Sequence, residues 1–134
     1  MKQSRTLIGA AFLAALFAGG CAEAEPTRFQ ISGTASVGGN PIPHGEILFT
    51  PDGARQNAGP QGIATIRDGR FDTAVDGKGI AGGPTVVRVT GFTKPGGKLL
   101  CEHELHVDLP RAKSTENFDV PPKAAPKDSP RTDI

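Results

Sequence analysis

The stretch that decides the fold reads Ala64-Thr65-Ile66-Arg67-Asp68-Gly69-Arg70-Phe71-Asp72-Thr73. Two short runs of alternating apolar and polar residues flank Asp68-Gly69, and this dipeptide readily adopts the positive φ values of a two-residue turn. The pattern therefore predicts an antiparallel β-hairpin. Because successive side chains of a strand point to opposite faces, the register places Phe71 in the core and Arg70 in solvent.

Similar strand-like runs continue on both sides of the hairpin, without a helical period after residue 20. They are residues 29–37, 46–50, 84–90, 101–109 and, more weakly, 117–120. Glycine and proline residues separate them, with corners at 38–45 and 94–97. Six or seven strands with turns about every 8–12 residues predict an all-β fold, an antiparallel β-sandwich of about seven strands over residues 28–120.

Three segments, residues 31–34, 39–47 and 49–51, resemble the opening of carboxypeptidase regulatory-like domains. The shared pattern is a strand, a glycine-proline corner with an apolar residue after the proline, a glycine, and an alternating second strand. Residues 64–71 and 83–89 continue the likeness, which covers residues 28–120. The resemblance implies a transthyretin-like (prealbumin-like) sandwich, such as small planctomycete-type lipoproteins carry behind a lipobox.

The resemblance specifies no activity, and the sequence contains neither a G-x-S-x-G nucleophile motif nor a converging acid, base and nucleophile. Hydroxyisourate hydrolases of the transthyretin-like group end in Tyr-Arg-Gly-Ser. This chain ends in Arg131-Thr132-Asp133-Ile134 and contains no Tyr. We therefore expect a protein that is not an enzyme and needs no cofactor.

The N-terminus carries a pattern typical of export. Lys2 and Arg5 precede the uncharged residues 6–20, a stretch shorter than the roughly 20 apolar residues that a spanning helix needs. The following Ala18-Gly19-Gly20-Cys21 resembles a bacterial lipobox, with Ala18 where that motif usually has Leu. The resemblance implies a lipoprotein signal peptide over 1–20, lipidation of Cys21, and a tether over 21–27.

An alternative processing site lies just beyond Cys21. Ala22-Glu23-Ala24 is a small-x-small sequence of the kind that ordinary signal peptidases cleave. Cleavage there would release the protein without an anchor. Either route leaves Cys101 as the last cysteine, so no internal disulfide forms, and we expect Cys101 to behave as a small buried apolar residue.

Length and charge exclude several classes of protein. A chain of 134 residues has room for one domain, which rules out a multidomain enzyme or a multi-pass membrane protein. Without residues 1–20 it keeps all 14 acidic residues and 13 of the 15 basic ones, a net charge of −1. Such a chain has no field of one sign to attract nucleic acid, so the expected membrane contact is the lipid anchor.

Two constellations could carry chemistry. Glu102, Glu104 and His106 share one face of a strand while His103 points to the other, and His44 lies elsewhere; the spacing is not that of the helical H-E-x-x-H zinc motif. Residues 77–82 read G-x-G-x-x-G, but a β-branched run follows where a dinucleotide site needs a helix. Both fit ordinary surface structure, so we assign no metal site.

The sequence thus predicts a non-catalytic, lipid-anchored module of the cell envelope with an unidentified envelope protein or ligand as partner. The competing prediction is an envelope protein that binds a small ligand or a divalent metal. It would use the Glu102, Glu104 and His106 face, or the loops 54–61 and 75–83. Residues 121–134 contain four prolines and mixed charges, which predicts a disordered tail.

Overall fold

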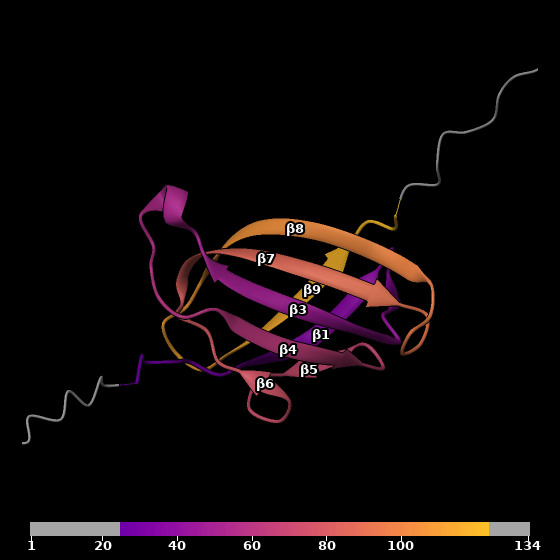
Figure 1. Ribbon diagram of the computed structural model, residues 1–134, viewed down its shortest axis with the longest axis horizontal. Coiled ribbons are helices and arrows are strands. Elements are labelled where there is room, and N and C mark those ends of the chain that lie inside the picture. Colours follow the sequence, from indigo (N-terminus) through magenta and orange to yellow (C-terminus); the bar gives the residue numbers. More distant parts are fainter. Residues whose placement is uncertain (1–24, 124–134) are drawn as a thin grey trace, which may run out of the picture.

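The computed structural model describes residues 25–123, and these residues form a β-sheet domain without an α-helix (Figure 1). The nine strands are β1 (Ile31–Val37), β2 (Asn40–Pro41), β3 (His44–Pro51), β4 (Gly62–Arg67), β5 (Arg70–Asp72), β6 (Gly77–Lys78), β7 (Gly83–Phe92), β8 (Leu99–Leu109) and β9 (Ser114–Val120). A single 3-10 turn, Gly53–Arg55, follows β3. The predicted signal peptide, Cys21 and the tail beyond Lys123 lie outside the described residues.

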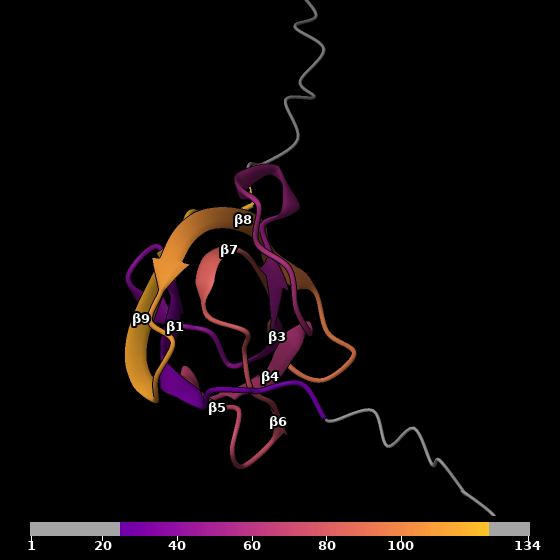
Figure 2. The ribbon, with the colours of Figure 1, turned by 90° about the vertical axis from the view of Figure 1, so that its left-hand side faces the viewer.

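All nine strands belong to one hydrogen-bonded sheet with the order β2-β1-β5-β4-β3-β7-β8, to which β6 adds beside β4 and β9 beside β1. The sheet curls on itself, so that β8 and β9 approach each other (Figure 2). Every strand pair is antiparallel except β1 with β9, which is parallel. The predicted all-β fold is confirmed. The strands form one curled sheet that is antiparallel, as predicted, except where β1 and β9 pair in parallel.

The hairpin that anchors the sequence prediction is present as β4 and β5. Asp68 and Gly69 have φ values of 50° and 75°, as a two-residue hairpin turn requires. Phe71 is buried at 4% exposure and Arg70 is exposed. The predicted register is therefore confirmed.

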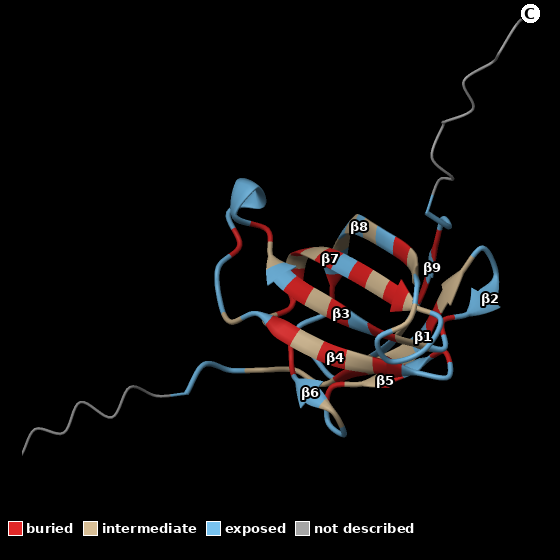
Figure 3. Cartoon of the chain, turned by 45° about the vertical axis from the view of Figure 1, so that its right-hand side comes forward, coloured by how far each residue is buried: buried red, intermediate tan, exposed pale blue. Residues whose placement is uncertain are grey.

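The concave side of the curl holds the core, and burial alternates along each long strand (Figure 3). Phe49, Phe71 and Phe118 come from β3, β5 and β9, and their ring centroids lie 5.9–6.2 Å apart. Around them lie Ile31, Ala35, Ile42, Ile47, Ala64, Ile66, Ile80, Val87, Val89, Cys101, Leu109 and Val120, all buried. Burial of this apolar surface is the main driving force for a domain of this size.

The strand β6 lies in the glycine-rich connection that the sequence assigned to a loop, and the strands number nine instead of about seven. Two other details differ from the sequence prediction. Asn40 and Pro41, expected in a turn, form the short strand β2 against the end of β1. The weak strand expected at 117–120 begins at Ser114 and pairs with all seven residues of β1. Gly33 makes this pairing possible, because a side chain there would overlap the backbone carbonyl of Glu116.

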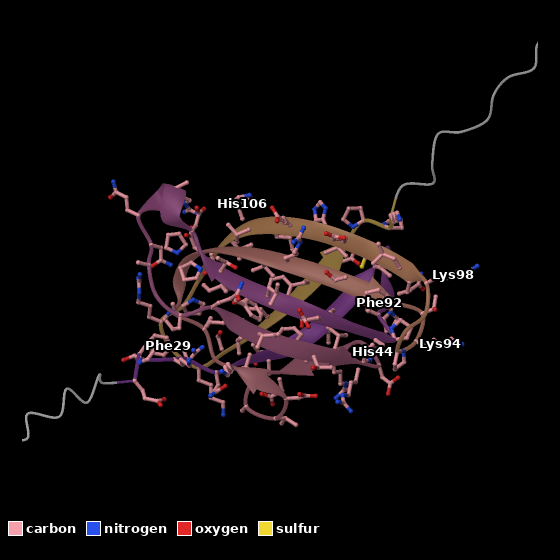
Figure 4. The ribbon with its side chains drawn as sticks, viewed as in Figure 1. Phe29, His44, Phe92, Lys94, Lys98 and His106 are labelled. Carbon is pink, nitrogen blue, oxygen red and sulfur yellow. The ribbon has the colours of Figure 1, made fainter. Side chains whose placement is uncertain are left out.

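The chain enters and turns at opposite ends of the domain. Phe29 forms a β-bridge with Ile80, and the Arg28 guanidinium donates to the carbonyls of Gln61 and Gly79. Figure 4 shows Phe29 at this end and Lys94 and Lys98, in the turn between β7 and β8, at the other. Beyond β9, the Lys123 N–H donates to the Leu100 carbonyl.

Candidate functional site

The strand β8 presents the acidic and histidine side chains that the sequence singled out. Glu102, Glu104 and His106 are exposed on the convex face, and His103 points inward and is half-buried. Arg88 on β7 lies between the two carboxylates, with nitrogen–oxygen distances of 2.7 Å to Glu102 and 3.8 Å to Glu104. A cation of the protein therefore occupies the place that a metal ion would take.

His106 contacts a carboxylate that sequence reasoning did not connect with it. Its Nδ1 lies 3.6 Å from the Oδ2 atom of Asp52, which is buried and caps the 3-10 turn by accepting from the Ala54 N–H. Arg55 in that turn forms a 2.8 Å ion pair with Asp108. These contacts hold the loop after β3 against β8. Within residues 25–123, no three or more His, Cys, Asp or Glu side chains gather closely enough to hold a metal ion.

The two remaining sequence candidates are structural. Cys101 is fully buried, as predicted, and burial raises the pKa of its thiol. The glycine-rich residues 77–82 form β6 and a loop, where the Gly82 carbonyl accepts from the buried Asn57 amide. The strand β7 follows directly. No helix N-terminus stands there to receive a phosphate.

A groove on the convex face is the feature that sequence reasoning missed. It has a volume of about 710 Å³ and crosses β9, β1, β5 and β4, with the turn after β5 as its wall. The strand β5 is only three residues long, and Thr73 makes the last backbone hydrogen bond to Ile31 before the chain turns away to form this wall. The prediction did name one loop of this wall, since Val75 and Asp76 belong to 75–83.

The wall of the groove is held by short polar contacts. The Asp72 carboxylate accepts from the Ala74 N–H at 2.9 Å, and the Asp72 carbonyl accepts from the N–H of Asp76 at 3.0 Å. Arg67 on β4 reaches across to the Asp76 carboxylate at 2.8 Å. At the tip of this turn, Val75 is 82% exposed. The turn is therefore fixed by these contacts and presents the apolar Val75 side chain at the rim of the groove.

The floor of the groove offers hydrogen-bond donors. The Thr34 N–H and hydroxyl both donate to Asn117 Oδ1, at 3.2 and 2.9 Å. This fixes the Asn117 amide and leaves its two N–H groups free of hydrogen bonds within the described residues. Arg70 is exposed beside Thr34 and forms no ion pair there either. The arrangement can bind a polar ligand, preferably one that carries an anionic group.

The sequence alone predicts only some of the residues that line this groove. The alternation along β1 and β5 places Ser32, Thr34, Arg70 and Asp72 outward, which is readable from the pattern. The parallel pairing that brings Asn117 beside Thr34 joins residues 83 positions apart and has no local signature. The groove therefore required the structure.

Comparison with known proteins adds no assignment, because no family model, no curated protein and no solved structure matches the chain. Within residues 25–123, no helix is long and apolar enough to cross a membrane.

Proposed function

We propose that the protein is a non-catalytic, lipid-anchored module of the cell envelope that binds another envelope component through the groove. The export pattern with Cys21 behind small residues supports the anchor. The curled all-β sheet is compatible with the transthyretin-like sandwich that the resemblance to carboxypeptidase regulatory-like domains implies. The single observation that carries the binding role is the groove, with unpaired donors on its floor.

The short connection between Cys21 and the domain sets its orientation in this proposal. Arg28 is fixed to Gln61 and Gly79, and the residues between Cys21 and Arg28 span at most about 25 Å when fully extended. A lipidated Cys21 therefore holds this end of the domain next to the membrane. The turn that carries Lys94 and Lys98 lies at the opposite end of the domain from Phe29 (Figure 4) and then faces away from the membrane.

The surroundings of Cys101 and of the Glu102 and Glu104 carboxylates support the proposal that the protein is not an enzyme. The Cys101 thiol is buried and its pKa is raised, so the nucleophilic thiolate is disfavoured. Arg88 is ion-paired with Glu102 and Glu104, which also weighs against the alternative of a divalent-metal protein. The other alternative, a small-ligand-binding envelope protein, uses the same groove as the interaction module.

Metabolic labelling tests the anchor. Radiolabelled palmitate enters the wild-type protein but not Cys21→Ser, and only the wild type sediments with membranes. Lipidation of Cys21 with diacylglycerol and an acyl chain gives stable attachment where a single chain is marginal. An intact-mass spectrum with an unmodified N-terminus at Glu25 contradicts the proposal and favours the secreted form.

A further inference from the structure

One row of outward side chains crosses the sheet near the end that carries the Asp68-Gly69 turn. The strand registers align Asn117 with Thr34, Thr34 with Arg70, Arg70 with Arg67, and Arg67 with His44. Five neighbouring strands thus each contribute one side chain that can donate a hydrogen bond. At the usual spacing of about 4.8 Å between strands, the row extends over about 19 Å.

The positions of two arginines in this row destabilise the fold. Arg67 and Arg70 face each other directly across the hairpin, and like charges in opposite positions destabilise a β-sheet. Asp76 compensates Arg67 through the 2.8 Å ion pair. Among the described residues, no carboxylate compensates Arg70. An anionic ligand would relieve this repulsion, so the arrangement indicates a binding site for an anion.

Acceptors lie one step along the strands from this donor row. Ser32 is aligned with Asp72 and with Thr115, so the second row carries hydroxyls and one carboxylate. The Asp76 carboxylate stands in the wall beside it. The groove therefore combines cationic donors on one side with carboxylate acceptors and hydroxyls on the other. A ligand that fits must carry an anion and hydroxyl donors on the same unit.

We propose that the groove binds an acidic oligosaccharide, with a sugar carboxylate on Arg70 and ring hydroxyls on Asp72 and Asp76. The Arg70 guanidinium offers the planar fork that suits a carboxylate, and the Asn117 amide N–H groups supply further donors. The inference deepens the proposed function by naming the class of envelope component. It depends on the proposed binding role of the groove and not on the lipid anchor.

The two rows distinguish this ligand from other polyanions. A nucleic acid would meet Asp72 and Asp76 with its phosphates, and these contacts repel. A neutral sugar would satisfy the acceptors but leave Arg70 without an anion. A sugar acid supplies partners for both rows.

Calorimetric titration of the exported domain with oligogalacturonate tests the inference. The wild type binds oligogalacturonate more tightly than a neutral maltooligosaccharide of the same length. Arg70→Ala weakens this binding about tenfold or more, as loss of a hydrogen bond to a charged partner does. Arg70→Lys, which keeps the charge but not the fork, gives an intermediate affinity, and Asn117→Ala weakens binding as well.

Arg55→Ala is the matched control, since it removes the same charge at the opposite end of the domain. Its affinity stays at the wild-type value because separated surface charges are screened at physiological salt. The melting temperature of each variant shows that the domain remains folded. Arg70→Ala melts at or above the wild-type temperature because it removes the like-charge pair.

Three results would overturn the inference: no binding of oligogalacturonate, equal affinity of Arg70→Ala and wild type, or binding of the maltooligosaccharide or of a single-stranded oligonucleotide as tightly as oligogalacturonate. These outcomes are separable from failure of the proposed function. Loss of palmitate labelling removes the anchor and leaves the groove intact. Sedimentation of the delipidated domain with cell-envelope material, without oligogalacturonate binding, refutes only the ligand class.

Discussion

The two halves of the convex sheet face differ in how completely their strands are paired. On one half, β7 and β8 are aligned over ten residue pairs, and Arg88 on β7 neutralises Glu102 and Glu104 on β8. On the other half, β5 is three residues long and meets β4 at a single aligned pair, Arg67 with Arg70. The first half is regular and compensated in charge, while the second is hollowed and keeps unpaired donors.

This difference shows what a shortened strand does to a sheet surface. Where strands run long, outward side chains meet partners at regular positions and satisfy one another. Where β5 ends early, the chain turns up at Asp72–Asp76 and leaves a hollow beside Thr34 and Asn117. On the outward face, we expect the side chains of the regular half to pair with one another and those of the hollowed half to be available for recognition, while both halves share the core.

The largest effect is expected where β9 meets β1. Gly33→Ala places a Cβ into the carbonyl of Glu116, so the parallel pair that floors the groove cannot form. We expect a loss of more than about 4 kcal/mol, enough to unfold a marginally stable domain, measured by urea denaturation. Gly53→Ala is the control, because a Cβ there meets nothing within 4 Å. A stable Gly33→Ala protein would show that the β1–β9 pairing is wrong.

The next effect separates the two faces of β5. Phe71→Ala removes a ring whose centroid lies 6.2 Å from that of Phe49 and 5.9 Å from that of Phe118, and should cost about 3–5 kcal/mol. Arg70→Ala should stay within about 0.5 kcal/mol of wild type because its side chain is exposed. Equal losses in the two variants, measured by the same urea titration, would contradict the register on which the groove depends.

Local features of the fold could be predicted from the sequence alone, whereas contacts between distant strands could not. The Asp68-Gly69 turn and the alternation around it were enough to place Phe71 in the core, because both are local signals. The fixed Asn117 amide and the compensation of Glu102 by Arg88 depend on which strands become neighbours. Pairing partners distant in sequence are set by the whole core, so these features could not be predicted.

A smaller, pH-dependent effect is expected at the edge of the hollowed half. The Gly39 N–H and the Ser36 hydroxyl donate to the Asp119 carboxylate and lower its pKa. A depressed folded-state pKa contributes stability above the unfolded value of about 3.9, and this contribution is lost as pH falls through the folded value. Asp119→Asn should therefore be less stable than wild type at neutral pH.

The difference should vanish once the pH is below the lowered folded-state pKa of Asp119, because the wild-type side chain is then neutral, as Asn is. Urea denaturation of both proteins at neutral pH and at a pH well below the ordinary aspartate pKa measures this. Glu25→Gln, an exposed change outside the sheet, serves as the control at both pH values. A difference between Asp119→Asn and wild type that persists unchanged in acid would show that the carboxylate charge does not tie β9 to the turn after β1.

The smallest effect is expected from removing metal ions or reducing the protein. Arg88 fills the acidic face of β8 and Cys101 is a buried free thiol, so the core has to hold the fold. Far-UV circular dichroism and the melting temperature should not change with EDTA or reductant. A drop of more than a few degrees with EDTA alone would make Glu102, Glu104 and His106 metal ligands and would reverse the roles of the two halves.

Amide chemical-shift mapping with oligogalacturonate tests most directly whether recognition belongs to the hollowed half. In a ¹H–¹⁵N titration of the labelled domain, we predict that the shifts concentrate at Thr34, Arg70 and Asn117 and saturate together. The amides of Glu104 and His106 on the regular half should stay in place. Saturable shifts confined to β7 and β8, or no saturable shift at any described residue, would contradict the assignment of recognition to the groove.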